Sequence, residues 1–431
     1  MERNEPLLFR KYPNLKKNIP WIPLLTQIPT PIERLTELEK KFEIDEGEIY
    51  IKRDDINHHI YGGNKLRKFE FIFGDVLKKK KSGVITIGGI GTNHGLACSI
   101  ICKYLDPPLK TELFLFPQPL TWHVQRSLLL FNHFKARLHL GKGDISTFLK
   151  ALFFQIIHPK YYFMFPGGSP LFGLGSSLGT LGFINAICEL KMQIEENVIP
   201  EPDVIFIAGG SNGTSGGLTA GCKLIGLKTK VHVVGVYDEF ISNPSAVKKN
   251  ANKALRYLRK FDKNVPKLTV SENDFEFSSD YLGSGYGIKT IKSQNAVDTI
   301  YELEGKNKNF MIETTYTGKA MAGMLDFLKE KENRSKKVLF WNTYNSNNLD
   351  HFLMETNFNY KNLPQKFHLF YEKEKFQCWQ IVDCPLELRK ECSAYLNHEY
   401  RFWKLLDCPL AEKEREKAIK VLTEVIKLED A

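Results

Sequence analysis

A lysine at the start of a predicted helix is the first residue of this sequence that could carry chemistry. Lys65 follows two glycines, and the apolar residues after it recur at helical spacing as far as Leu77. A helix N-terminus carries a partial positive charge, which disfavours a protonated amine there. If Lys65 is also partly desolvated, its pKa should be lowered and its amine should be a better nucleophile. An ordinary surface lysine after a loop is the alternative at this point.

A glycine-rich loop lies far downstream of this lysine. The fully apolar stretch Val204–Ala208 predicts a buried parallel strand, and the run 209–217 leads from it into another helix. Glycines let backbone N–H groups turn inward around a phosphate, and the helix dipole favours an anion. The loop lacks the Gly-Lys-Ser/Thr ending of nucleotide loops, so it predicts a different phosphate or anion site, with a tight packing turn as the alternative.

A second glycine turn follows the predicted strand Val84–Ile87. Residues 88–95 nearly match the dinucleotide pattern G-x-G-x-x-G, but His94 stands where the third glycine belongs. Thr92, Asn93 and His94 place three polar side chains at the start of the next helix. They would suit a carboxylate or a ring hydroxyl, or they could only cap a buried helix.

Polar residues also follow later strands, where open α/β sheets bind their ligands. Tyr286 lies in a glycine-rich stretch, Tyr316 precedes a helix that runs through Met321–Leu328, and Thr343 follows the strand Val338–Trp341. A single tyrosine of this kind is more often a structural hydrogen-bonding group than a catalyst.

The elements around these residues alternate between strand and helix, which predicts an α/β fold. We expect a helix to start at Thr30–Glu33, because threonine, proline and an acid occur in the order of a helix start, and a strand at Ile49–Arg53. We expect His58 and His59 to face solvent. The apolar stretch Phe148–Ile157 is too short to cross a membrane and predicts a core helix.

Composition indicates a globular protein of two or three domains. The chain has 431 residues, 42% of them hydrophobic, and a net charge of +10. The basic run 78–81 indicates a solvated helix end rather than a nucleic-acid patch, and no nucleic-acid-binding motif is present. Net positive charge also suits an anionic small ligand.

None of the eight cysteines forms a C-x-x-C pair or a cluster with zinc spacing, so no metal site is predicted. No long apolar run and no signal-peptide core occurs. We therefore expect reduced thiols in a cytoplasmic protein without membrane or nucleic-acid partners.

Taken in order, these motifs resemble the D-cysteine desulfhydrase and 1-aminocyclopropane-1-carboxylate deaminase family of pyridoxal-phosphate enzymes. The stretches that carry the resemblance are 52–55, 62–70, 87–94, 166–169, 210–218, 285–287, 316–323 and 338–343.

The resemblance implies a tryptophan synthase β-like fold, with two open, twisted, mostly parallel sheets flanked by helices. It implies a large cofactor-binding domain of residues 1–65 and 176–350 and a small domain of residues 66–175. Residues 351–431 lie outside the resemblance, and the apolar spacing of the last twenty residues predicts a C-terminal helical extension. Residues 351–431 form an extension of unassigned role, and a homodimer is expected.

The resemblance also implies roles for residues around pyridoxal 5'-phosphate. Lys65 would bind the cofactor covalently and move the substrate's α-proton, Asn93 would bind the cofactor's phenolic oxygen, and Thr343 would face its ring nitrogen. The remaining residues hold the phosphate or contact the substrate. The phosphate-binding residues would be Gly210, Ser211, Asn212, Gly213 and Thr214. The substrate-binding residues would be Thr92, Asn93, His94, Tyr286 and Tyr316, with Thr92 and both tyrosines also catalytic.

Two positions favour one activity within the family. Ring-opening deaminases have a glutamate where this chain has Thr317, and Thr343 is a hydroxyl residue as in the desulfhydrases. Both favour α,β-elimination from D-cysteine, giving pyruvate, ammonia and sulfide. The family usually has glutamine-serine where this chain has Gly91-Thr92, and Gly-Gly where it has Tyr344-Asn345, which puts bulk beside the ring.

Three alternatives remain open from the sequence. An NAD-binding oxidoreductase would use the turn at 88–95 but leaves Lys65 unexplained. A 1-aminocyclopropane-1-carboxylate deaminase would need activity without a carboxylate at Thr317. A catalytically silent homologue would bind the cofactor or an amino acid only, and Tyr344-Asn345 is the feature that supports it.

Overall fold

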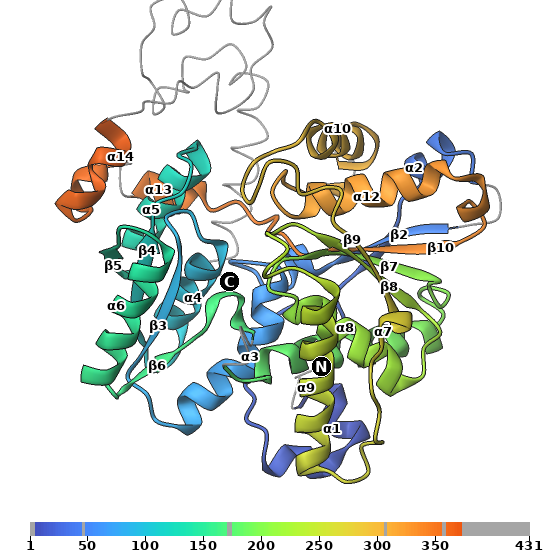
Figure 1. The fold of residues 1–431 in the computed structure, drawn as a ribbon, viewed down its shortest axis with the longest axis horizontal. Helices are drawn as coiled ribbons and strands as arrows, with labels where there is room; N and C mark the ends of the chain where they lie inside the picture. Colours follow the sequence, from blue (N-terminus) through green and yellow to red (C-terminus); the bar gives the residue numbers. More distant parts are fainter. Residues whose placement is uncertain (1–4, 45–47, 170–174, 306–307, 356–358, 373–431) are drawn as a thin grey trace, which may run out of the picture.

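The computed structural model describes residues 5–44, 48–169, 175–305, 308–355 and 359–372. Two separate sheets organise this part of the chain (Figure 1). The larger sheet has six strands, in the order β1 (Ile32–Arg34), β2 (Glu48–Arg53), β10 (Lys337–Asn342), β7 (Val204–Gly209), β8 (Lys230–Gly235) and β9 (Phe275–Ser278). The smaller sheet has four, in the order β5 (Arg137–Leu140), β4 (Lys110–Phe116), β3 (Gly83–Gly89) and β6 (Tyr161–Phe163).

Every strand pair is parallel except β1 with β2. Helices cover both faces of each sheet, which explains why the central strands are apolar throughout. The prediction of an α/β fold with two mostly parallel sheets is confirmed.

The helices of the larger sheet form two layers. On one face, apolar residues of α2 (Thr36–Lys41), α10 (Ile291–Ile300) and α12 (Thr317–Lys329) pack together with Phe206 and Phe340 of the sheet. On the other face lie α3 (Asn64–Lys78), α7 (Leu178–Glu195), α8 (Gly213–Ile225) and α9 (Pro244–Phe261), with α1 (Leu7–Lys11) against α7. Helix α3 lies near the centre of the view, between the two sheets (Figure 1).

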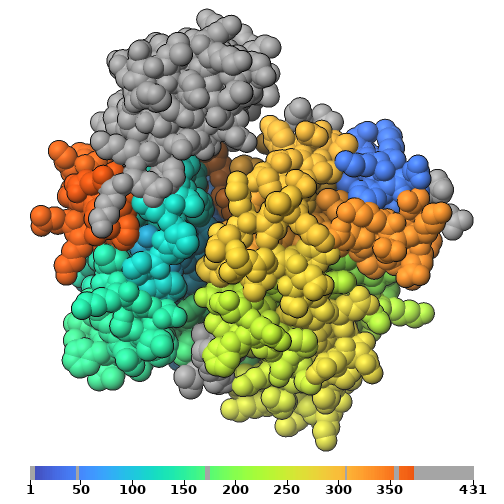
Figure 2. Space-filling model, turned by 45° about the horizontal axis from the view of Figure 1, so that its top comes forward, coloured from blue at the N-terminus to red at the C-terminus, as the bar shows by residue number. Residues whose placement is uncertain are grey.

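The smaller sheet also has a helix layer on each face. Helices α4 (Asn93–Tyr104) and α5 (Trp122–His133) pack on the side that carries Val84 and Leu113, whereas α6 (Asp144–Ile157) packs on the side that carries Ile85 and Phe114. In the space-filling view, the green and teal residues of this half face the yellow residues of the other half across a groove (Figure 2).

The chain after β10 reaches from the larger sheet to the smaller half. Helix α13 (Asp350–Glu355) lies beside α5, and Asp350 pairs with Arg126 of α5 at 2.7 Å. Further on, α14 (Leu369–Glu372) is held on α5, because Tyr371 Oη donates to the Gln125 carbonyl at 2.6 Å. The helical pattern predicted for the last twenty residues lies outside the described residues.

Three local predictions are wrong. Thr30 does not start a helix: its hydroxyl lies within hydrogen-bond distance of Asp54 and Glu189 in the interior, and residues 32–34 form a strand. His58 does not face solvent; it is buried, and its ring accepts a hydrogen bond from the backbone N–H of Ile60. The stretch Phe148–Ile157 is helical, but it is not a core helix, because only Thr147 and Ala151 of α6 are buried.

Candidate active site

Helix α3 starts where the Gly62-Gly63 turn contacts the loop after β10, and this contact fixes the position of Lys65. Gly63 has φ of 103°, and a Cβ there would lie 2.7 Å from the Thr343 carbonyl oxygen, so only glycine allows the contact. The Asn64 N–H donates to the same carbonyl at 3.2 Å, and the Gly62 N–H donates to Asn345 Oδ1 at 2.7 Å. The turn before the lysine is therefore clamped to the loop that follows β10.

Lys65 has the electrostatics of a nucleophilic amine. Burial lowers the pKa of Lys65 to about 8, although the charge of Glu313 opposes the shift. Its Nζ donates to Asn64 Oδ1 at 2.7 Å, and Asn64 Nδ2 in turn donates to Thr214 Oγ1 at 3.1 Å. Asn64 therefore joins the lysine to the glycine-rich loop.

That loop lies between β7 and α8, and hydrogen bonds to neighbouring residues fix its conformation. Asn212 takes up a left-handed conformation with φ of 56°, and its Oδ1 accepts from Ser215 Oγ. The Ser211 carbonyl accepts from Asn250 Nδ2 at 3.1 Å. A Cβ at Gly210 would meet no atom closer than Tyr316 Cε1, at 3.5 Å. The loop therefore turns its free side toward Tyr316.

Lys68 is a residue that our sequence reasoning missed. It lies one helical turn after Lys65, is buried, and its Nζ donates to the Gly167 carbonyl and to Ser169 Oγ, both at 2.9 Å. Among the described residues these neutral partners are the only ones for its ammonium. Burial and the charge of Lys65 hold the pKa of Lys68 well below its usual value. The i,i+3 spacing of the lysines was the available signal.

The position of Lys68 tests whether a phosphate fits here. Its Nζ would lie 3.2 Å from a Cβ placed on Gly213, so the buried amine borders the glycine-rich loop. A buried cation with only neutral partners is costly unless an anion compensates it. The N-terminus of α8, the glycines and Lys68 together fit the phosphate of pyridoxal phosphate.

The three polar residues of the turn after β3 make different contacts. Thr92 caps α4, since its Oγ1 accepts from the Gly95 N–H at 3.3 Å. The backbone carbonyl of Asn93 accepts from Tyr61 Oη at 3.3 Å. His94 is buried, with Nε2 3.1 Å from Thr86 Oγ1 of β3, and its Nδ1 has no partner in the described part of the chain. Burial, with the charges of Lys65 and Lys68, holds the pKa of His94 well below its usual value.

Gly91, in the same turn, departs from the family pattern for a steric reason. A Cβ at Gly91 would lie 2.8 Å from Val124 Cγ2 and 3.2 Å from Gln118 Nε2. The amide of Gln118 occupies this space, and its Oε1 accepts from the Gly91 N–H at 3.3 Å. Gln118, which the sequence did not single out, thus supports the turn where a larger residue at position 91 has no room.

Two tyrosines lie close together at the start of α12. Tyr316 immediately precedes the helix, and Tyr286 lies in a loop beside it. Tyr286 Oη and Tyr316 Oη share a hydrogen bond of 2.5 Å, and the ring of Tyr237 packs on Tyr286 with centroids 4.4 Å apart. Burial raises the pKa of Tyr286 to about 12 and raises that of Tyr316 well above its usual value. Both tyrosines therefore remain protonated phenols at neutral pH.

Glu313 is a third residue that we did not predict. Its carboxylate caps α12, accepting from the Thr315 N–H at 2.7 Å and the Tyr316 N–H at 2.8 Å. Thr317 Oγ1 accepts from the Glu313 N–H at 2.9 Å and is buried. At the position where ring-opening deaminases have a glutamate, this chain therefore has a buried hydroxyl that is hydrogen-bonded to the backbone of Glu313, just before α12.

The three residues after β10 have different surroundings. The Thr343 hydroxyl makes no hydrogen bond to any described residue, so it is free for a ligand. Burial raises the pKa of Tyr344 to about 12, and the charge of Glu313 adds to the shift. The Asn345 amide binds the Gly62 N–H on one side and the Asn347 carbonyl, at 2.8 Å, on the other.

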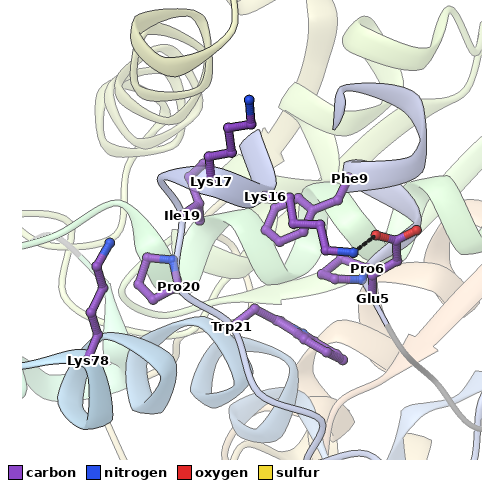
Figure 3. A pocket seen from close by; sticks show the side chains of 9 residues that line it. All are labelled: Glu5, Pro6, Phe9, Lys16, Lys17, Ile19, Pro20, Trp21 and Lys78. Atoms are coloured by element: carbon purple, nitrogen blue, oxygen red, sulfur yellow. Dashed lines mark hydrogen bonds and ion pairs between the residues drawn. The ribbon is translucent and has the colours of Figure 1, made fainter. Parts of the chain in front are cut away.

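A pocket in the described residues lies away from this site, and neither a metal-ligand cluster nor a membrane-spanning helix is found among them. Figure 3 shows a pocket in the N-terminal region, lined among others by Phe9, Trp21 and Lys78, that contains no predicted site residue. No group of three or more histidine, cysteine, aspartate or glutamate residues is arranged to hold a metal ion in the described ranges. A search of the same ranges for a helix long and apolar enough to cross a membrane finds none.

Comparison with known proteins supports the resemblance found in the sequence. Residues 24–343 match the family described as "Pyridoxal-phosphate dependent enzyme". A Thermotoga maritima protein named "Putative 1-aminocyclopropane-1-carboxylate deaminase" is 30% identical over 73% of this chain and 93% of its own length. A Salmonella paratyphi A protein named "D-cysteine desulfhydrase" is 31% identical over 73% of this chain and 91% of its own length.

A solved structure described as an "ACC deaminase homologue" superimposes with a TM-score of 0.64 and 26% identity, covering 79% of this chain and 95% of that chain. The resemblance to this family and the predicted cofactor are therefore confirmed. The roles assigned to individual residues remain proposals.

Proposed function

Since this chain belongs to the family of pyridoxal-phosphate dependent enzymes, we propose that it catalyses α,β-elimination on a small amino acid, with D-cysteine as the first choice. One D-cysteine and one water would give pyruvate, ammonia and hydrogen sulfide. The observation that carries this choice is Thr317, whose buried hydroxyl supplies no acid where ring-opening deaminases have a glutamate.

In this proposal Lys65 provides both the covalent attachment and the base. Bound pyridoxal phosphate supplies an aldehyde that condenses with amines and a ring that withdraws electrons from the substrate's α-carbon. With a pKa of about 8, Lys65 has a sizeable neutral fraction at physiological pH and can accept the α-proton at Nζ.

The phosphate would be held by two features that lie side by side. Backbone N–H groups of the loop 210–214 and the start of α8 would bind its oxygens. The ammonium of Lys68 would supply the counter-charge, because it borders Gly213. Asn93 would bind the phenolic oxygen of the cofactor, and the free hydroxyl of Thr343 would face its ring nitrogen.

Substrate would lie between the start of α4 and the tyrosine pair. Its carboxylate would meet Thr92, Asn93 and the unpaired Nδ1 of His94. Tyr286 and Tyr316 would line the opposite side as neutral phenols, and their O–H groups could donate hydrogen bonds to the departing sulfur, because both retain their protons at neutral pH.

Two observations support a second activity. The Thermotoga maritima relative carries the name of a 1-aminocyclopropane-1-carboxylate deaminase. Glu313 places a carboxylate three residues before Tyr316, so the site does contain an acid although Thr317 is not one. We propose this deaminase activity as the alternative, and cofactor binding without turnover as the outcome if both fail.

The test is the visible spectrum of the purified full chain before and after D-cysteine, with sulfide and pyruvate measured in parallel. Cofactor absorbance that shifts while both products appear is the expected result. Absorbance with no sulfide, but with 2-oxobutyrate from 1-aminocyclopropane-1-carboxylate, would select the alternative. Absorbance with neither product would leave a silent homologue.

We further propose that the protein acts as a homodimer in the cytoplasm, on a small amino acid and without nucleic-acid partners. Support comes from the small-molecule site between the two sheets and from the exposed apolar side chains of α6.

A further inference from the structure

The pocket in the N-terminal region is a cavity that the active site does not use. Its volume is about 470 Å³, and its lining residues come from the segments 5–9 and 16–21 and from Lys78 of α3 (Figure 3). We call it the N-terminal pocket. A cavity of this size can hold a small molecule.

Part of the wall of the N-terminal pocket is apolar and aromatic. Phe9 and Ile19 are buried residues that line it, and Pro20 and Trp21 are half-buried beside them. Walls of this composition bind the apolar or aromatic body of a ligand.

The rest of the lining carries an excess of positive charge. Three lysines and one glutamate line the pocket, and the glutamate, Glu5, is already paired with Lys16 at 2.9 Å. In the part of the chain that the structure describes, no carboxylate pairs with Lys17 or Lys78, and Lys78 Nζ donates only to the Asn18 carbonyl, at 3.4 Å. Figure 3 shows Lys78 on one side of the pocket and the Lys16–Glu5 pair on the other. Two ammonium groups at one cavity therefore lack a counter-charge, which an anion would supply.

Contacts with α3 hold the aromatic part of the wall in place. A Cβ at Gly74 of α3 would lie 2.5 Å from the Trp21 backbone nitrogen, so the two backbones are in close contact. The Ile22 N–H donates to the Glu70 carbonyl at 3.0 Å, and the Leu24 N–H donates to the Glu70 carboxylate at 3.1 Å. Because the wall is already ordered, a ligand would pay little for ordering it.

We propose that the N-terminal pocket binds a small organic anion, which has an apolar or aromatic body and a carboxylate, sulfonate or phosphate group. The body lies against Trp21, and the anionic group lies near Lys17 and Lys78. This site goes beyond the proposed function, because Lys78 and Lys65 are at opposite ends of α3, about 20 Å apart along the helix. The ligand of this pocket is therefore not the amino-acid substrate.

A polyanion such as a nucleic acid fits this region less well. It binds rows of available cations along an open surface. Here Lys79 is paired with Asp75 at 2.7 Å, and Lys81 Nζ donates to the Pro159 carbonyl at 2.6 Å. The cations without a carboxylate partner that remain at the pocket lie beside an aromatic wall, which suits one small molecule.

The test is calorimetry on the full chain loaded with pyridoxal phosphate, so that the phosphate loop is occupied, with naphthalene-1-sulfonate as the probe. One probe should bind per chain. Lys17→Glu and Lys78→Glu should each weaken its binding at least tenfold. Lys80→Glu is the matched control, because Lys80 is an exposed lysine of the same basic run that does not line the pocket, and it should bind the probe as the wild type does.

The chemistry of the probe tests the two parts of the site separately. Neutral 1-naphthalenemethanol and inorganic sulfate should each bind at least tenfold more weakly than naphthalene-1-sulfonate. Equal affinity for either one would overturn the proposed ligand class.

Three results would overturn the site itself. They are the absence of binding at millimolar naphthalene-1-sulfonate, an equal loss of affinity in Lys80→Glu and Lys17→Glu, and binding of a single-stranded oligonucleotide through Lys17 and Lys78 without binding of the probe. The last result would assign these lysines to a polyanion.

Discussion

At the scale of single residues, two lysines of one helix differ in their surroundings. Lys65 and Lys68 are both buried, and both have lowered pKa values. Lys65 also feels the charge of Glu313, whereas Lys68 has neutral partners and borders the glycine-rich loop. We therefore assign the covalent chemistry to Lys65 and the phosphate counter-charge to Lys68.

Replacing Lys68 should separate stability from cofactor binding. Lys68→Met removes a buried amine without a counter-ion, so the cofactor-free protein should gain about 1 kcal/mol in free energy of unfolding. The same change should weaken cofactor affinity at least tenfold, or about 1.4 kcal/mol. Thermal unfolding and an absorbance titration would measure the two effects. Lys78→Met, at the exposed end of the helix, is the control, and unchanged affinity in Lys68→Met would contradict the assignment.

The pKa of Lys65 predicts how cofactor capture depends on pH. Only the neutral amine attacks the aldehyde, so the capture rate should rise with pH and level off above a midpoint near 8. An ordinary lysine would keep gaining reactivity to beyond pH 10. Stopped-flow absorbance with cofactor-free protein would give the midpoint, and a value near 10.5 would show that Lys65 is not desolvated.

The sequence singled out candidate site residues whose evidence is local and did not single out those whose partners are distant. Lys65 and the loop 210–214 are marked by glycines and by helical spacing nearby. Lys68 depends on Gly167 and Ser169, about a hundred residues away, and Gln118 on its contact with Gly91. Such tertiary contacts leave no periodic signal in the chain.

At the scale of elements, a buried lysine of α12 positions the loop that carries Tyr286. Lys319 is fully buried, and its Nζ donates to the Leu282 carbonyl at 2.7 Å, with the Gly285 carbonyl at 3.5 Å. Gly283 and Gly287 of this loop are exposed to solvent. Lys319 therefore holds Tyr286 at hydrogen-bond distance from Tyr316 of the same helix start.

Removing this anchor should affect substrate more than cofactor. Lys319→Met should raise the KM for the amino-acid substrate about tenfold, because a lost charged hydrogen bond costs about 1.5–3 kcal/mol and frees Tyr286. Cofactor absorbance should be unchanged, and kcat should fall less than kcat/KM. The exposed Lys329→Met, on the same helix, should have wild-type kinetics. Equal loss of cofactor from Lys319→Met would argue for a general folding defect instead.

Helices and strands with regular spacing were predictable, whereas their exposure was not. The spacing of Phe148–Ile157 correctly indicated a helix, but apolar residues on both of its sides could not tell which of them are buried and which are exposed. Thr30 followed the rules of a helix start, yet tertiary contacts with Asp54 and Glu189 overrode them.

At the scale of the whole molecule, a buried ionic cluster fastens the lysine helix to the larger sheet. Arg67 of α3 pairs with Asp54 at 2.6 Å and with Glu189 of α7 at 2.9 Å, and Lys52 of β2 pairs with Glu189 at 2.7 Å. Trp341 of β10 donates to Asp54 at 2.7 Å. Two cations and two anions balance, so the cluster is neutral while it joins four elements behind Lys65.

Breaking this balance should destabilise the protein. Burial alone would raise the pKa of Glu189, but Arg67 and Lys52 outweigh it and hold that pKa well below the usual range. Glu189→Gln leaves an excess buried positive charge, which should cost about 3–5 kcal/mol of unfolding free energy. Denaturant unfolding would measure it against Glu195→Gln, an exposed residue on the same helix. A loss below 1 kcal/mol would mean that the cluster relaxes or admits water.

The most direct test of this account is to locate the covalent attachment of the cofactor. The full chain is loaded with pyridoxal phosphate, reduced with borohydride, digested and mapped by mass spectrometry, with Lys65→Ala treated in parallel. We expect the reduced adduct on Lys65 alone, and no adduct and no turnover in Lys65→Ala. An adduct on Lys68, or none on either lysine, would contradict the assignment on which the site is built.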